Sequence, residues 1–100
     1  MTTISINKLE SFLQNSSHTY LIDVRSPVEF ATGHIPNSIN FPVDEFSQFQ
    51  FPKHYSYIFI CNTGMRAIQA YQYLINQGYP NVFHITGNLI EWAGKLEYGF

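Results

Sequence analysis

Cysteine and charged residues are both scarce in this chain. Its 100 residues contain one cysteine, Cys61, and charged side chains make up 12% of the sequence. A single cysteine cannot form a disulfide within the chain, and no second thiol or cluster of cysteine and histidine has the spacing of a zinc site. The sequence therefore predicts no disulfide, no metal and no other cofactor, and it leaves a free thiol whose role needs an explanation.

Basic residues and long apolar runs are also limited. The five lysines and arginines are scattered, the net charge is −2, and no stretch approaches the roughly 18 apolar residues of a spanning helix. Such a chain presents no electrostatic stripe to a nucleic acid. The N-terminus lacks the charged and apolar regions of a secretory signal. We therefore expect a cytoplasmic protein whose partners include neither nucleic acid nor a membrane.

Length and patterning predict one α/β domain over residues 1–100. Strands are expected where short segments are rich in β-branched and aromatic residues, at 20–24, 57–60 and 82–85, with a brief edge strand at 39–41. Amphipathic helices are expected at 7–14, 67–75 and 88–93. The longest repeats apolar residues on one face, namely Ala67, Ala70, Tyr71, Leu74 and Ile75, and ends before Gly78 and Pro80.

A helix start follows the first of these strands. Ser26, Pro27 and Glu29 have the spacing of a capping box with proline at the first helical position. The segment 33–38 ends this helix after a few residues. Arg25 and Glu29 are four residues apart, and this spacing predicts an ion pair between them.

Cys61 lies between the apolar segment 57–60 and a helix-patterned stretch. This placement aims the N–H groups of the next loop and helix start at the sulfur, and such groups stabilise negative charge. Arg66 adds a permanent cation. Both favour the thiolate, which is the nucleophilic form of cysteine. A buried cysteine with a structural role is the alternative, but Gly64 and Arg66 favour a functional thiol.

Three ordered motifs cover much of the chain. They run from Leu21 to Phe30 (LIDVRSPVEF), from Gly33 to Pro42 (GHIPNSINFP) and from Cys61 to Arg66 (CNTGMR). Together they resemble the single-domain rhodanese-like sulfurtransferase family. The resemblance implies an α/β fold with a mainly parallel five-stranded sheet flanked by helices, and places the cysteine loop at the carboxyl end of a central strand. Ligands bind at that edge of open α/β sheets.

The resemblance also implies sulfur transfer. The Cys61 thiolate would take a sulfane sulfur from thiosulfate or another persulfide donor and pass it to cyanide or a thiol acceptor. The residues expected to bind the substrate and the anionic persulfide follow it in the loop: Asn62, Thr63, Gly64, Met65 and Arg66. Arg66 either attracts an anionic donor or braces the loop through an ion pair. The expected partners are a small anionic sulfur donor, a thiophilic acceptor and, as a variant, a sulfur-accepting protein.

Two other functions stay open. One is a non-catalytic or redox-sensing binding module, in which Cys61 senses oxidants or has no chemical role. The other is a small-anion phosphatase or arsenate reductase, because related domains with a loop longer by one residue resemble enzymes that enclose a tetrahedral oxyanion. Four residues separate Cys61 from Arg66, and this six-residue loop suits one sulfur atom better than a phosphate.

Two positions depart from the family's pattern. Asn62 stands where Arg or Lys is common, which predicts weak binding of thiosulfate and favours a protein or low-molecular-weight persulfide as donor. Gly87 and Asn88 stand where a pair of glycines is usual. Asparagine tolerates left-handed backbone geometry and caps helices, so we expect the fold to persist.

The remaining polar residues are expected to support the loop. Asp23 at the end of a strand could act as a general base, but carboxylates there commonly accept N–H hydrogen bonds, which favours a bracing role for Asp23 beside Arg25. An imidazole can act as a base near neutral pH, but an ionised thiolate needs none, and the resemblance places His34 in a turn. Trp92 is expected in the core. The aromatic-rich segment 41–59 fits either a core or an exposed partner surface.

Overall fold

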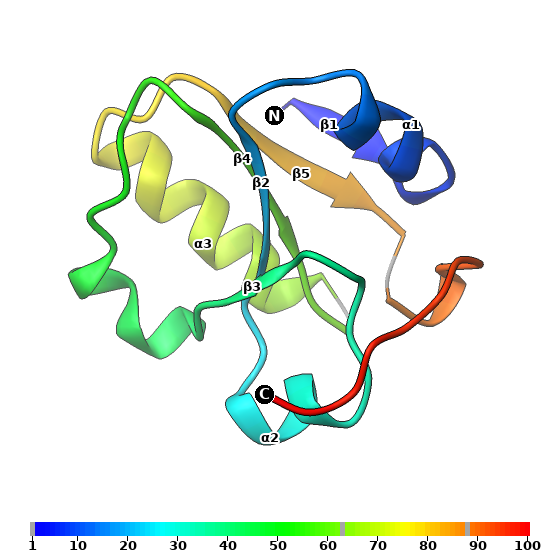
Figure 1. Cartoon of the computed structure of the whole chain (residues 1–100). Coiled ribbons are helices and arrows are strands. Elements are labelled where there is room, and N and C mark those ends of the chain that lie inside the picture. The colour runs from blue at the N-terminus through cyan, green and yellow to red at the C-terminus, as the bar shows by residue number, and fades with distance from the viewer. Residues whose placement is uncertain (1, 63, 88) are drawn as a thin grey trace.

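The computed structural model describes residues 2–62, 64–87 and 89–100. Its strands are β1 (Thr3–Ser5), β2 (Thr19–Asp23), β3 (Ile39–Asn40), β4 (Ser56–Ile60) and β5 (Val82–Thr86). Its α-helices are α1 (Leu9–Gln14), α2 (Pro27–Ala31) and α3 (Met65–Asn76), and short 3-10 helices form η1 (Ile6–Lys8), η2 (Val43–Gln48) and η3 (Leu89–Glu91). Figure 1 shows this arrangement. The expected strands and the helices expected at 7–14 and 67–75 are thus confirmed. The amphipathic helix expected at 88–93 is wrong, because the described part of that segment forms only the short 3-10 helix η3.

The five strands form one parallel sheet in the order β1-β5-β4-β2-β3. This confirms the predicted fold class. The central strand β4 pairs with β2 over the full length of both, Thr19 to Asp23 opposite Ser56 to Ile60. Because the two strands run in the same direction, their carboxyl ends and the loops that follow lie side by side at one edge of the sheet.

Residues of β4 alternate between two hydrophobic cores. Tyr57 and Phe59 belong to the core that includes α3 and η2, whereas Ile58 and Ile60 belong to the core that includes η1 and α1. Figure 1 shows α3 and α1 on opposite sides of the sheet. Side chains alternate along a strand, so Cys61, the next residue after β4, continues the row that faces α3 and joins that core.

Helix α3 packs most of its predicted apolar face on the sheet. The side chains of Ala67, Ala70, Tyr71 and Leu74 are buried. Ile75 was expected on the same face, but it is 44% exposed, because it lies at the rim of the apolar stripe. The helix ends two residues before Gly78, whose φ of +87° is the left-handed geometry that glycine accepts readily. No helix in residues 2–62, 64–87 and 89–100 combines the length and apolar character needed to cross a membrane.

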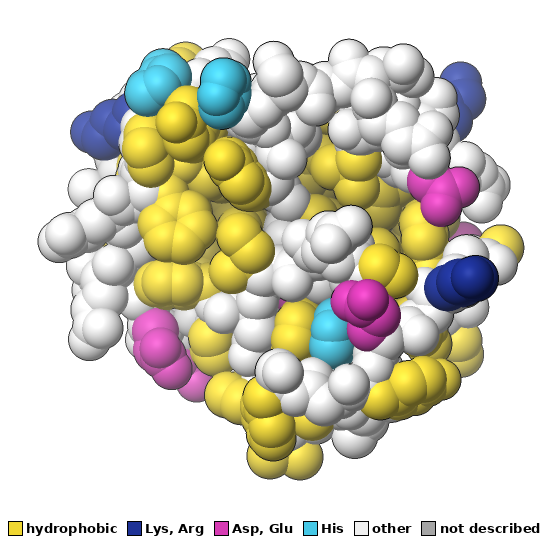
Figure 2. Space-filling view, viewed as in Figure 1, with side chains coloured by type: hydrophobic (Ala, Val, Ile, Leu, Met, Phe, Trp, Pro, Cys, Tyr) yellow, Lys and Arg dark blue, Asp and Glu magenta, His cyan; other side chains and the backbone are white. Residues whose placement is uncertain are grey.

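The aromatic segment 41–59 is mainly core. Phe46, Phe49 and Tyr57 are buried, and Phe49 contacts both other rings at centroid distances of 5.0 and 5.4 Å. Phe51 and Tyr55 are half-buried at its margin. Figure 2 shows hydrophobic side chains gathered over the segment that joins η2 to β4. These residues therefore close the α3 side of the sheet and leave a partly exposed aromatic edge.

A buried ion pair follows β2. The Arg25 guanidinium donates to the Asp23 carboxylate at 2.8 and 3.0 Å, and a second bond of 2.8 Å joins it to the carbonyl of Gly33. Both side chains are almost inaccessible to solvent. The predicted pair between Arg25 and Glu29 is therefore wrong, because Arg25 turns inward to Asp23. Asp23 also accepts the N–H of Arg25 at 3.1 Å, which confirms the expected bracing contact.

This buried pair makes a prediction about stability. Replacing the guanidinium in Arg25→Met leaves the Asp23 carboxylate buried without its cation, and we expect a loss of about 3 to 5 kcal/mol in the free energy of unfolding. Urea denaturation followed by circular dichroism measures it. The double variant with Asp23→Asn should lose less than the two single variants combined. A loss below about 1 kcal/mol in Arg25→Met would contradict this account.

Candidate active site

Cys61 occupies the first position after β4, at the edge of the sheet predicted for the site. Its side chain is 1% exposed. The N–H groups of Gly64 and Ala67 donate to its sulfur at 3.0 and 3.4 Å. These donors belong to the N-terminal turn of α3 and its cap, where N–H groups lack partners within the helix. The sulfur therefore lies in a setting that stabilises negative charge.

Gly64 makes this geometry possible. It caps α3 with φ of +86° and ψ of −15°, a left-handed conformation that costs glycine little and disfavours other residues. That turn directs the Gly64 N–H back toward the Cys61 sulfur, while its carbonyl accepts the N–H of Ile68 at 2.9 Å. The glycine of the cysteine motif thus has a backbone role rather than a side-chain one.

Arg66 is paired with Glu29 of α2. Its Nη1 and Nη2 donate to the two carboxylate oxygens at 2.6 and 3.0 Å, which is the bidentate geometry of strong arginine–carboxylate pairs. About a third of each side chain is exposed. Arg66 was predicted either to attract an anionic donor or to brace the loop through an ion pair. The structure contains the ion pair.

The capping box of α2 fixes the position of Glu29. The Ser26 hydroxyl accepts the N–H of Glu29 at 3.3 Å, and the Ser26 N–H donates to Glu29 Oε1 at 3.0 Å, as predicted. Glu29 Oε2 also accepts from the side-chain amide of Asn62 at 3.3 Å. Hydrogen bonds from Arg66, aided by the Ser26 N–H, lower the pKa of Glu29 from 4.5 to about 2.

The predicted supporting residue His34 lies three residues after the end of α2 and forms an isolated antiparallel β-bridge with Glu97. Its ring stacks on Phe30 with centroids 3.6 Å apart, and Nδ1 is 2.8 Å from the Phe30 carbonyl. Its backbone exchanges two hydrogen bonds with Glu97. These contacts support a structural position for His34 and tie the C-terminal segment to α2.

Three contributors to the site were missed in the sequence. Glu29 was assigned to the wrong partner, Ala67 was counted only as core, and His84 of β5 was seen only as a strand residue. Gly64 lies close to the His84 ring, since a Cβ on that glycine would be 3.9 Å from Nε2. This nitrogen is buried and has no hydrogen-bond partner among the described residues. Burial lowers the pKa of His84. The sequence did contain a signal for His84: in β5 it alternates with Val82, so both side chains lie on the α3 side of the sheet.

The other predicted loop residues lie around Cys61. Asn62 and Met65 are exposed, and Met65, at 67%, presents an apolar side chain to solvent. Thr63, predicted to bind substrate, and Asn88, predicted to replace a glycine, lie outside the described residues.

Two hollows flank the cysteine loop. One, of about 560 Å³, is lined by Asn62, Arg25 and residues of the C-terminal segment, including Ile90. The other, of about 160 Å³, is lined by Arg66 together with Asp44 and Glu45. Cys61 itself lines neither hollow.

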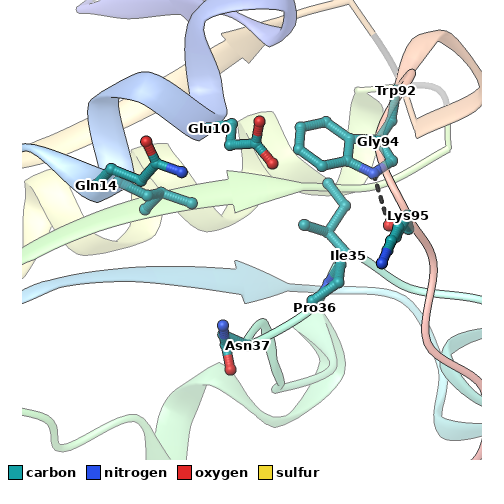
Figure 3. A pocket seen from close by; sticks show the side chains of 9 residues that line it. Glu10, Gln14, Ile35, Pro36, Asn37, Trp92, Gly94 and Lys95 are labelled. Atoms are coloured by element: carbon teal, nitrogen blue, oxygen red, sulfur yellow. Dashed lines mark hydrogen bonds between the residues drawn. The ribbon is translucent and has the colours of Figure 1, made fainter.

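A separate pocket of about 480 Å³ lies beside α1. Figure 3 shows Glu10 and Gln14 facing Ile35 and Trp92 across it. Trp92 Nε1 donates to the carbonyl of Lys95 at 2.9 Å. Trp92 packs against the α1-side core but is half-buried, so its predicted core position holds in part. Cys61 does not line this pocket.

A buried cysteine after a central parallel strand, with helix N–H groups aimed at its sulfur, defines an anion-stabilising thiol site. The sequence matches the rhodanese-like domain over residues 5–95, and the chain belongs to this family. A protein named sulfurtransferase from Allochromatium vinosum is 33% identical over 92 residues, which cover 90% of this chain and 86% of that protein. A tRNA uridine(34) hydroxylase from Yersinia enterocolitica is 33% identical over 87 residues, but these are only 25% of its length.

Solved structures agree with this assignment. A rhodanese-like domain protein from Staphylococcus aureus superposes with a TM-score of 0.87 and 29% identity, and the match covers 100% of both chains. A rhodanese-related protein from Thermoplasma volcanium gives a TM-score of 0.84 at 25% identity, covering 97% of this chain and 98% of the other. The chain is thus a rhodanese-like domain with a sulfurtransferase relative, and the family also includes proteins with other named activities.

The Glu29–Arg66 pair predicts a pH-dependent contribution to stability. The folded-state pKa of Glu29 is lowered, so its stabilising effect is complete above pH 4.5 and is lost as the pH falls towards 2. We expect Glu29→Gln to cost about 1 kcal/mol at pH 7, as solvent screens a partly exposed pair. Urea denaturation at several pH values should show the difference from wild type shrinking between pH 5 and pH 3. A difference that is constant with pH would contradict this assignment.

Proposed function

We propose that this protein is a sulfurtransferase that carries a sulfane sulfur on Cys61. The observation that supports this proposal best is the convergence of the Gly64 and Ala67 N–H groups on the Cys61 sulfur, at 3.0 and 3.4 Å. Preorganised donors of this kind stabilise a thiolate before reaction and an anionic persulfide after it. The sulfurtransferase relative supports the same activity.

The reaction proceeds in two half-reactions. The Cys61 thiolate attacks the outer sulfur of the donor, and the sulfur–sulfur bond of the donor breaks. Thiosulfate would leave as sulfite, and an alkyl hydropersulfide would leave as a thiolate. The Cys61 persulfide then gives its outer sulfur to cyanide, forming thiocyanate, or to a thiolate, forming a new persulfide, and the Cys61 thiolate returns. Covalent catalysis of this type predicts ping-pong kinetics.

The proposed partners are a small sulfur donor, a thiophilic acceptor and, as a variant, a sulfur-accepting protein. Asn62 makes thiosulfate a poor donor, since it supplies no cation to a dianion, and a persulfide is preferred. Asp23, Arg25 and His34 are proposed to act through the loops they hold and not on substrate. We do not extend the hydroxylase activity to this chain, because it spans a quarter of the hydroxylase's length.

Mass spectrometry of the intact protein tests this function. After incubation with cysteine hydropersulfide or with thiosulfate, wild type should gain one sulfur atom, and cyanide should remove it with formation of thiocyanate. Cys61→Ser, which keeps the size of the side chain, should gain none. The absence of an adduct with either donor in a folded wild-type protein would reject the proposal and favour a binding module.

A second assay addresses the phosphatase alternative. The six-residue loop from Cys61 to Arg66 leaves little space for a tetrahedral phosphate, and Arg66 is engaged by Glu29. We expect hydrolysis of p-nitrophenyl phosphate by wild type to equal that of Cys61→Ser at pH 6 to 8. Hydrolysis that depends on Cys61 would overturn the preference for sulfur transfer.

A further inference from the structure

The Glu29 carboxylate contacts residues at both ends of the loop that follows Cys61. It accepts two bonds from Arg66, at 2.6 and 3.0 Å, and one from Asn62, at 3.3 Å. Its fourth donor is the Ser26 N–H at 3.0 Å. One acidic side chain from α2 therefore links the beginning and the end of the cysteine loop. Its pKa is lowered from 4.5 to about 2, so it stays ionised well below neutral pH.

Positive charge beside the loop is neutralised. In the described part of the chain, Arg66 is the basic residue that lines the smaller hollow, which it shares with Asp44 and Glu45. Arg25 lines the larger hollow, but its guanidinium is committed to Asp23. In each hollow, the negative charge of nearby acidic side chains thus equals or exceeds the positive charge of the arginine. Among the described residues that line the two hollows, an approaching dianion therefore meets no unpaired cation.

We infer that Glu29 is a specificity-determining residue. By pairing with Arg66 it disfavours dianionic sulfur donors, and the site therefore favours persulfides that carry no dianionic group. The inference rests on the proposed function. In the favoured reaction the Cys61 thiolate attacks the terminal sulfur of an alkyl hydropersulfide. The sulfur–sulfur bond of the donor breaks, the alkyl thiolate leaves, and the proton stays on the transferred sulfur. One negative charge is present on each side of this step.

Thiosulfate places a greater demand on the same site. Attack by the thiolate brings three negative charges together, and the products, a persulfide anion and sulfite, carry the same three. Backbone N–H groups aimed at the Cys61 sulfur stabilise the charge that resides there. The charge on the sulfonate group needs a cation of its own. Arg66 has the chemistry for that role, but its donors are directed at the Glu29 carboxylate.

The test compares two donors across a set of variants. Glu29→Gln keeps an oxygen acceptor for the Ser26 N–H but removes the charge that holds Arg66. We expect its kcat/KM for thiosulfate to rise about tenfold, with that for cysteine hydropersulfide changing less than threefold. The gain should shrink as ionic strength rises. Glu29→Gln combined with Arg66→Gln should lose the gain.

Two further variants keep the test decisive. Glu10→Gln removes the same charge from an exposed position on α1 and should change neither donor's kcat/KM by more than twofold. Asn62→Arg keeps Ser26 and Glu29 of the α2 cap and adds a second cation within reach of the Glu29 carboxylate. One carboxylate cannot neutralise two guanidinium groups, so this variant should also raise the kcat/KM for thiosulfate selectively. Thermal unfolding identifies any variant that does not fold.

The outcomes separate this inference from the proposed function. If wild type forms the Cys61 persulfide, but neither Glu29→Gln nor Asn62→Arg favours thiosulfate, Glu29 does not set specificity and sulfur transfer stands. An equal rise for both donors would likewise overturn the inference, because it would show a general effect on the thiol. Failure of wild type to form a persulfide with any donor would reject the function itself.

Discussion

The parallel pairing of β2 with β4 is the constraint on which the site depends. The hydrogen-bonded register of Asp23 opposite Ile60 ends the two strands at the same level, so the loops that follow must leave the sheet together. One loop contains the buried Asp23–Arg25 pair and leads into α2, and the other contains Cys61 and leads into α3. The Glu29 and Arg66 side chains can then meet, because backbone pairing has already set the separation of the loops that lead into α2 and α3.

The bond between α2 and the cysteine loop shows how local and tertiary interactions combine. Glu29 is fixed first by its own helix cap, which is a contact between neighbours in sequence. It then reaches Arg66 and Asn62, more than thirty residues away. The same carboxylate therefore caps the N-terminus of α2, joins α2 to the cysteine loop and neutralises the positive charge of Arg66 beside the thiol. A change at this residue is expected to alter all three properties together.

Sequence reasoning located the elements better than the side-chain partners. The positions of β2, β4, β5 and α3 follow from apolar periodicity, because burial acts on every residue of such a segment. The three-residue strand β1 has too few residues for a pattern. Ion pairs were less predictable. The four-residue spacing of Arg25 and Glu29 identifies neighbours on one helix. It cannot show that Glu29 pairs instead with Arg66, which follows a different strand.

The burial of Cys61 has a consequence for how long a transferred sulfur would stay on the protein. With 1% of the residue exposed and no other thiol in these 100 residues, an acquired sulfur atom has no internal route of discharge. Its residence time would be set by how often an outside thiol reaches the loop. The domain would then work as a sulfur reservoir whose release is timed by its acceptor.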